Sequence, residues 1–133
     1  MLKWNEGLAT GIPEIDAEHK MLFSHLNALY SMARRGIDDD ALGKVLADLT
    51  EYTMFHFEHE ARLMREFGYP DMQSHLREHE GIKKIVEAYD LFHEKHGDIA
   101  VVTNLLSFVQ KWIVNHIEET DRTLAEYLKQ CGK

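Results

Sequence analysis

The stretch that determines the fold runs from Leu42 to Pro70 and reads LGKVLADLTEYTMFHFEHEARLMREFGYP. Its core-type residues recur at intervals of three and four, which is the spacing of one face of an α-helix. That face consists of Leu42, Val45, Leu46, Leu49, Thr53, His56, Glu60, Leu63, Met64 and Phe67. Gly68-Tyr69-Pro70-Asp71 then ends the helix and offers Asp71 as a cap for the next one. The stretch therefore predicts a long amphipathic helix with a histidine and a glutamate on its inward face.

Three further segments of the sequence have core-type residues with the same helical spacing, and each such set of residues is called a stripe here. The first helix is expected to begin near Pro13 and end at Gly36, and Asp38-Asp39-Asp40 can cap the helix that follows. Gly97-Asp98 provides another stop and cap between the last two helices. The first stripe is Ile15, His19, Leu22, Phe23, Leu26, Leu29 and Tyr30; the third is His75, His79, Ile82, Val86 and Tyr89; the fourth is Val102, Leu105, Val109, Trp112, Ile113, His116, Thr120, Leu124 and Leu128.

Four long helices with short connections predict an all-α fold. No segment alternates with period two over the length of a strand, so the expected architecture is an antiparallel up-down-up-down four-helix bundle. The 133 residues suit one domain, residues 1–133, with one core. Residues 1–12 precede the first helix, and we expect them to form an N-terminal arm that packs through Trp4 and Leu8.

Charge and composition exclude several classes of partner. A net charge of −8 with no basic cluster argues against binding to nucleic acid or to an anionic membrane. The N-terminus lacks the apolar run of a signal peptide, and no stretch is long enough for membrane insertion. The single cysteine, Cys131, cannot form an internal disulfide, which favours a cytoplasmic location.

Polar residues interrupt all four stripes at positions that should be apolar. A buried imidazole or carboxylate is costly unless it is paired or bound to a metal ion. His75 and His79 are four residues apart, as are His56 and Glu60, so each pair projects from one side of its helix. Several such residues converging from four helices indicate a metal centre. Its candidate ligands are His19, His56, Glu60, His75, His79, His116 and Asp121.

His116 and Asp121 do not fit an ideal helix. Five residues advance the helix by roughly 140° beyond a full turn, so the two side chains would point in different directions. Glu119, three residues after His116, is better placed by geometry alone. Asp121 fits only if the helix ends or is distorted there, and the spacing leaves both carboxylates open.

The remaining histidines are not expected to be metal ligands. His25, His93 and His96 lie off the stripes or at a helix end, which indicates solvated side chains. His59 lies between His56 and Glu60 but is rotated away from the direction of Glu60, so it is interpreted as a neighbour of the site and not as a ligand.

The donor set indicates two ions of a borderline metal. Five imidazoles and two carboxylates are more ligands than one tetrahedral zinc ion binds. Calcium or magnesium would require more oxygen donors. Iron is the leading candidate, with manganese or zinc as replacements on overproduction. Ferritin-like di-iron bundles use four glutamates and two histidines. The more neutral set here stabilises highly oxidised iron less, which favours binding and release of dioxygen over its cleavage.

Three motifs carry a family resemblance: HFEHE at 56–60, HLREH at 75–79 and HIEETD at 116–121. Together with Trp4, GIPEIDAEH at 11–19 and WIVNHI at 112–117, they resemble the hemerythrin family, specifically its single-domain bacterial members, over nearly the whole chain. The resemblance implies two non-haem iron ions that cycle between Fe2+ and Fe3+, share an oxo or hydroxo bridge, and bind dioxygen reversibly.

The resemblance also implies a role for each candidate ligand. His75, His79 and His116 would bind one iron, and His19 and His56 would bind the other, which keeps one position open for dioxygen. Glu60 and Asp121 would bridge the two, so the resemblance favours Asp121 over Glu119. An oxygen pocket would be lined by Leu22, Phe57, Trp112, Ile113 and Ile117. One departure is Ala61, because many relatives have a second glutamate directly after the bridging one.

The sequence therefore predicts an oxygen-binding protein, not an enzyme, that stores, delivers or buffers dioxygen, with an unidentified oxygen-accepting protein as its partner. The alternatives are a di-iron oxidase or peroxidase, a nitric oxide reductase, and an oxygen or redox sensor that acts through a partner. Iron storage or a purely structural metal site would need no open coordination position.

Overall fold

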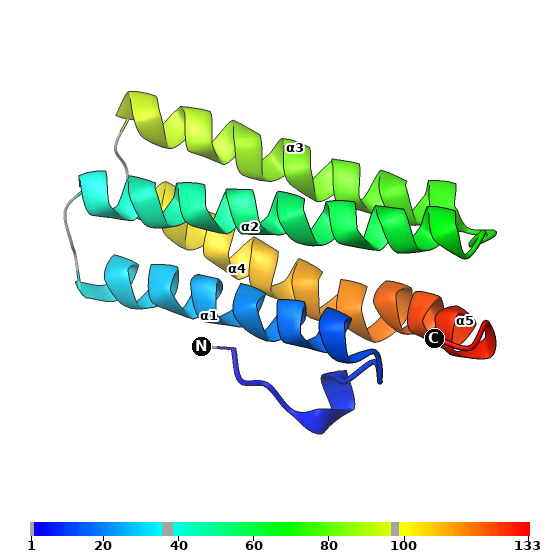
Figure 1. Ribbon diagram of the computed structural model, residues 1–133. Helices are drawn as coiled ribbons and strands as arrows, with labels where there is room; N and C mark the ends of the chain where they lie inside the picture. The colour runs from blue at the N-terminus through cyan, green and yellow to red at the C-terminus, as the bar shows by residue number, and fades with distance from the viewer. Residues whose placement is uncertain (1, 36–38, 97–98) are drawn as a thin grey trace.

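The computed structural model describes residues 2–35, 39–96 and 99–133, which form helices and no strand (Figure 1). The N-terminal segment contains a single 3-10 turn, η1. The last long helix continues through a π-helical segment, η2, into a short final helix. The elements are η1 (Glu6–Leu8), α1 (Pro13–Arg35), α2 (Asp39–Glu66), α3 (Met72–His96), α4 (Ile99–Asn115), η2 (His116–Asp121) and α5 (Arg122–Gln130).

The four long helices form an antiparallel bundle, as the stripes predict. α1 packs against α2 and α4, and α3 packs against α2 and α4, so consecutive helices are neighbours (Figure 1). The predicted fold class is thus confirmed. Among the described residues, the fourth helix differs from the expectation: the sequence pattern predicts one continuous helix from Val102 to Leu128, but η2 divides it. Within the described ranges, the helices lack any apolar stretch long enough to cross a membrane.

The N-terminal segment is attached to α1 at two points. Near the start of α1, the carboxylate of Asp16 accepts hydrogen bonds from the backbone N–H groups of Thr10 and Gly11. Gly11 has a φ of 86°, a conformation that favours glycine. Further along the helix, Asn27 exchanges two hydrogen bonds with the backbone of Leu2. Trp4 packs edge-on against Phe23, so the segment lies along α1 (Figure 1).

The break between α2 and α3 lies where the glycine and proline indicate it. α2 ends at Glu66, and Gly68 takes a φ of 62° in the turn. The backbone carbonyl of Asp71 accepts the N–H of His75, so Asp71 stands at the start of α3. The other two expected breaks, at Gly36-Ile37-Asp38 and at Gly97-Asp98, lie outside the described residues, as do the side chains of Asp39, Asp40, Leu42, Tyr89, His93, His96 and Val102.

A polar layer separates two apolar parts of the core. On α1, His19 lies between Ile15 and Leu22, which belong to different apolar clusters. Leu49 and Leu63 flank the polar residues of α2 in the same way, again one from each cluster. Apolar packing on both sides therefore fixes the height of each helix, and with it the position of the polar side chains.

Candidate metal centre

The seven candidate ligands come together in two overlapping groups. One group contains Glu60, His75, His79, His116 and Asp121, and the other contains His19, His56, Glu60 and Asp121. Within each group the donor atoms lie within 4.8 Å of one another. All seven residues are buried, with at most 4% of their surface exposed. Glu60 and Asp121 belong to both groups, so they lie between two positions at which a cation could bind.

Each element delivers its donors by simple helical geometry. α1 contributes His19, and α2 contributes His56 and Glu60, whose donor atoms are 3.6 Å apart. α3 contributes His75 and His79, whose rings are in edge contact at 4.5 Å. On both α2 and α3 the two donors are four residues apart, and residues with this spacing lie one above the other on a helix face.

The π-helical segment η2 brings His116 and Asp121 together. Its wider turn places residues five apart on one side, which an α-helix does not do. His116 Nε2 lies 3.2 Å from Asp121 Oδ1. Glu119, the alternative that the spacing left open, has an exposed side chain outside both groups. The distortion that Asp121 requires is therefore present, and π-helical turns are frequent at functional sites.

Burial and neighbouring charges shift the pKa values of several residues in the two donor groups. Burial lowers the pKa of His75, but hydrogen bonds and the charges of Asp121 and Glu60 outweigh it and raise the pKa to about 10. Burial and the charge of Asp121 work to raise the pKa of Glu60, yet the neighbouring histidines hold it at about 2. Burial lowers the pKa of His79. Without a cation, the polar layer is thus held by ionised carboxylates facing protonated histidine.

Several buried donor atoms face one another without a full set of hydrogen bonds, which tests whether metal ions fit here. His19 Nε2 lies 2.9 Å from Asp121 Oδ2, yet among the described residues neither atom has a hydrogen-bond partner. His79 Nε2 and His116 Nε2 are 3.0 Å apart and can share at most one proton. Buried nitrogen and oxygen lone pairs that converge in this way suit cations, and this mixture of donors suits iron or zinc.

Two carboxylates outside the donor groups contact candidate ligand histidines through the ring nitrogen that faces away from the centre. Glu18 Oε1 lies 2.6 Å from His56 Nδ1, and Glu78 Oε1 lies 3.0 Å from His116 Nδ1. Each bond fixes the Nδ1–H as a donor and leaves Nε2 for the centre. Sequence reasoning missed both glutamates. The available signal was a glutamate directly before a ligand histidine, at 18–19 and at 78–79, where a rotation of about 100° turns it toward the adjacent helix.

Two histidines that were not expected to be ligands, His25 and His59, differ in their contacts. His25, which the sequence predicted to be solvated, is half-buried, and its ring centroid lies 5.2 Å from that of Tyr52. His59 lies outside both donor groups, as expected, but its Nδ1 is 2.6 Å from Glu18 Oε2. His59 therefore contacts the outer support of the site.

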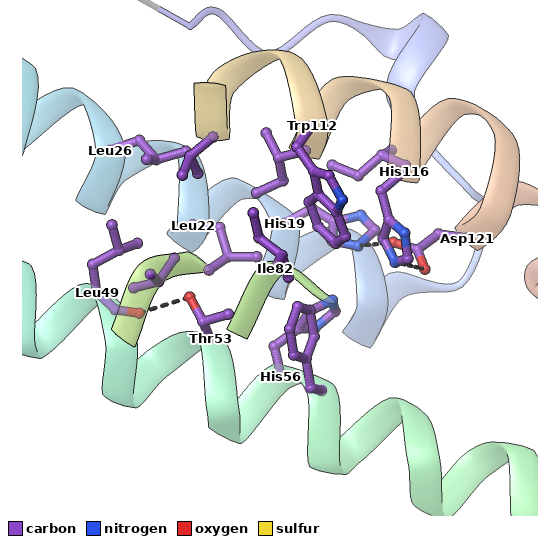
Figure 2. Close-up of a pocket in the computed structure, with 15 residues that line it drawn as sticks. His19, Leu22, Leu26, Leu49, Thr53, His56, Ile82, Trp112, His116 and Asp121 are labelled. Carbon is purple, nitrogen blue, oxygen red and sulfur yellow. Dashed lines mark hydrogen bonds and ion pairs between the residues drawn. The ribbon is translucent and has the colours of Figure 1, made fainter. Parts of the chain in front are cut away.

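A small apolar cavity of about 30 Å³ adjoins the group of four donors. Figure 2 shows His19 and His56 at its polar end, together with His116 and Asp121. Thr53 also lines the cavity, but its hydroxyl donates to the carbonyl of Leu49 at 2.7 Å. The five expected pocket residues all line it: Leu22, Phe57, Trp112, Ile113 and Ile117. Sequence reasoning missed Leu26, Leu49, Thr53, Ile82, Val86 and Val109.

Comparisons with known proteins agree with this geometry. The family model for the hemerythrin HHE cation binding domain matches residues 10–128. The bacteriohemerythrin of Stenotrophomonas maltophilia (strain R551-3) is 35% identical over 97% of this chain and 82% of its own length. That of Clostridium acetobutylicum is 31% identical over 92% of this chain and 97% of its own. A crystal structure of wild-type hemerythrin superposes with a TM-score of 0.88 and 28% identity, covering 96% of this chain and 98% of that one.

Proposed function

Because the chain belongs to the hemerythrin family, we propose that it binds dioxygen reversibly at a centre of two non-haem iron ions. The observation that carries the proposal is the pair of donor groups joined by Glu60 and Asp121, with an apolar cavity that is lined by His19 and His56 from one group and by His116 from the other. A structural metal site would need no such space. The cavity of about 30 Å³ exceeds the roughly 10–15 Å³ that one water-sized molecule needs, so it has room for a diatomic gas.

The seven residues would bind the two metal ions in different combinations. His75, His79 and His116 would hold one ion, His19 and His56 the other, and Glu60 and Asp121 would contact both. When bound, two ferrous ions supply the electrons that dioxygen takes up and returns on release. Because the protein offers fewer donors on the side of His19 and His56, an ion held there would have room for the gas beside it.

The cavity walls favour release over cleavage. Leu22, Ile113 and Ile117 exclude water, and Thr53 has its hydroxyl committed to a backbone carbonyl. General acid catalysis needs a proton donor within hydrogen-bond reach of the reacting atom. Apart from the candidate ligands, the residues that line the described cavity offer no free acid. The cavity walls would therefore surround an oxygen molecule with apolar groups that do not assist breakage of its bond.

This proposal makes the chain an oxygen-storing, oxygen-delivering or oxygen-buffering protein that acts without catalysis, in the cytoplasm, with an oxygen-accepting protein as its partner. The visible spectrum of the reduced, iron-loaded chain should change on exposure to oxygen and return when oxygen is removed. Elemental analysis should give two irons per chain. Sustained consumption of oxygen in the presence of a reductant and an organic substrate, with no reversible change, would support the oxidase alternative instead.

A further inference from the structure

His59 belongs to neither donor group, but it makes a short hydrogen bond to a residue that contacts one of them. Its Nδ1 lies 2.6 Å from Glu18 Oε2, and the other oxygen of the same carboxylate lies 2.6 Å from His56 Nδ1. Glu18 comes from α1, whereas both histidines come from α2. One carboxylate therefore accepts two short hydrogen bonds from consecutive turns of the neighbouring helix.

We propose that His59 is a positioning residue: by occupying the second oxygen of Glu18, it fixes the carboxylate that orients His56 toward its metal ion. The inference rests on the proposed function, because it requires a metal ion at the group formed by His19, His56, Glu60 and Asp121. His59 itself touches neither the metal nor oxygen.

Burial explains why Glu18 needs a second donor. Its side chain is only 11% exposed, and a buried carboxylate oxygen without a hydrogen bond is costly. With His56 as its only donor, the carboxylate gains by turning its free oxygen to water. His59 prevents this, because short bonds to a carboxylate are among the strong hydrogen bonds of proteins. His56 and His59 are three residues apart on one helix, so the two donors are held at a fixed separation.

A fixed carboxylate matters because it sets the direction of the His56 ring. The bond from Nδ1 to Glu18 determines which nitrogen carries the proton and where Nε2 points. The ring of His56 is in edge contact with the ring of His19, with the two centroids 4.8 Å apart. His56 also lines the apolar cavity. The cavity leaves the ring room to rotate on that side, so the hydrogen bond to Glu18 adds a restraint that the packing there does not supply.

The same arrangement recurs at the other donor group, which supports the inference independently. Glu78 accepts the Nδ1–H of His116, and the hydroxyl of Thr120, one turn further along, donates to the same carboxylate at 2.8 Å. In both places a glutamate from one helix is held by a ligand histidine and by a second donor from the adjacent helix. Glu78 is 43% exposed and has access to water, so the second donor is more important at Glu18.

The test uses three substitutions of His59 and one control. In His59→Ala the donor is lost. In His59→Asn the amide nitrogen takes the place of Nδ1, and in His59→Gln it lies too far along the side chain. Glu58→Gln, one residue away and exposed, removes a charge from the surface ion pair with Arg65. Each chain is loaded with ferrous iron without oxygen, and the release of each iron to a chelator is timed.

We expect His59→Ala to release one of its two irons roughly tenfold or more faster than the parent chain, since loss of an outer partner typically weakens metal binding by 10–100-fold. The other iron should leave at the parent rate. His59→Asn should restore most of the retention, and His59→Gln should not. In the zinc-loaded chain, which is diamagnetic, the slowly exchanging Nδ1–H proton of His56 should be visible by NMR in the parent and in His59→Asn but absent in His59→Ala.

The outcomes separate this inference from the proposed function. A parent chain that binds fewer than two irons overturns the proposed function, whatever His59 does. A parent chain that binds two, combined with parent-like release and an intact His56 proton signal in His59→Ala, overturns the positioning role alone. Equal acceleration in His59→Ala and His59→Asn also overturns it, because the hydrogen-bond donor would then not be the cause.

Discussion

The group of five donors and the group of four donors meet at Glu60 and Asp121 but lie in different surroundings. Around the group of five, aromatic rings cover the histidines: Phe57 stacks on His79 at 3.7 Å, and Trp112 stacks on His116 at 4.4 Å. Around the group of four, both histidines line the apolar cavity, whereas of the three histidines in the group of five His116 reaches it. The group of five is thus richer in protein donors, and the group of four has fewer donors and both of its histidines beside the space for a small molecule.

The strongest test of this comparison removes what the two groups share. We expect Glu60→Ala and Asp121→Ala to lose the spectrum of a coupled iron pair and to retain at most one iron per chain, because each removes a donor from both groups. Glu119→Ala is the matched control, since its carboxylate is exposed and lies two residues from Asp121. Iron analysis and visible spectroscopy provide the measurement. Loss of iron in Glu119→Ala, with retention in Asp121→Ala, would contradict the division of donors.

Removing the metal tests the groups in another way, through the pH dependence of stability. Donors without a cation leave buried polar atoms unsatisfied, so the metal-free chain should unfold at a lower temperature by roughly 10 °C or more. The raised pKa of His75, about 10 against an ordinary 6.5, gives stability that is complete below pH 6.5 and is lost as the pH rises through 10. The lowered pKa of Glu60, about 2 against 4.5, gives stability that is present above pH 4.5 and is lost toward pH 2.

The metal-free chain should therefore be most stable between pH 4.5 and 6.5. The iron-loaded chain should instead gain stability from pH 5 to pH 7, since protons compete with metal ions for the same donors. Thermal unfolding of both forms across this range measures the effect. Parallel curves for the two forms would show that the donors do not exchange protons for metal.

A third test addresses the cavity alone. Leu22→Ser should admit water beside His19 and His56 and speed oxidation of the oxygenated protein several-fold, with the seven ligands in place. Leu29→Ser is the matched control, because Leu29 is buried on the same helix but does not line the cavity. Both substitutions should destabilise the chain by about 2–4 kcal/mol through lost packing. Equal rates of oxidation in the two variants would indicate that general loosening, and not water in the cavity, is responsible.

The smallest expected effect concerns the outer support of the group of five. Thr120→Val removes the second donor to Glu78 at nearly constant volume. Because Glu78 is 43% exposed, water can replace the hydroxyl, and the cost should be about 1 kcal/mol or less. Iron retention on that side should fall by less than tenfold, a smaller change than His59→Ala produces on the other side. A larger change than in His59→Ala would reverse the ranking of the two supports.

The fold and most of the polar layer could be predicted from the sequence because both depend on local spacing. The stripes fix which side of each helix is buried, and pairs four residues apart, such as His75 and His79, follow from the helix itself. Gly68 and Pro70 mark a break for backbone reasons that do not depend on the rest of the chain. These features need no knowledge of how the helices pack.

The remaining features depend on that packing. His116, Thr120, Leu124 and Leu128 are each four residues apart, a pattern that an α-helix and a π-helical turn both accommodate, so the spacing did not locate η2. Glu18 lies beside the stripe of α1, and only the position of α2 determines that it turns to His56 and His59 and not to water. The cavity is the volume left over after many side chains have packed, which no single motif specifies.

The wide turn of η2 also constrains how this chain can change over generations. α4, η2 and α5 follow one another without a loop, so the buried face of α5, which includes Leu124 and Leu128, has its rotation set by the number of residues in η2. The wide turn takes up one residue more than an α-helical turn, so rewinding the segment as an ordinary α-helix at its present length would rotate all that follows by about 100°. Asp121, five residues after His116, and the buried face of α5 could not then both keep their positions. The exposed residues Glu118 and Glu119 can therefore be replaced without moving α5, whereas the π-helical winding of the segment has to be preserved.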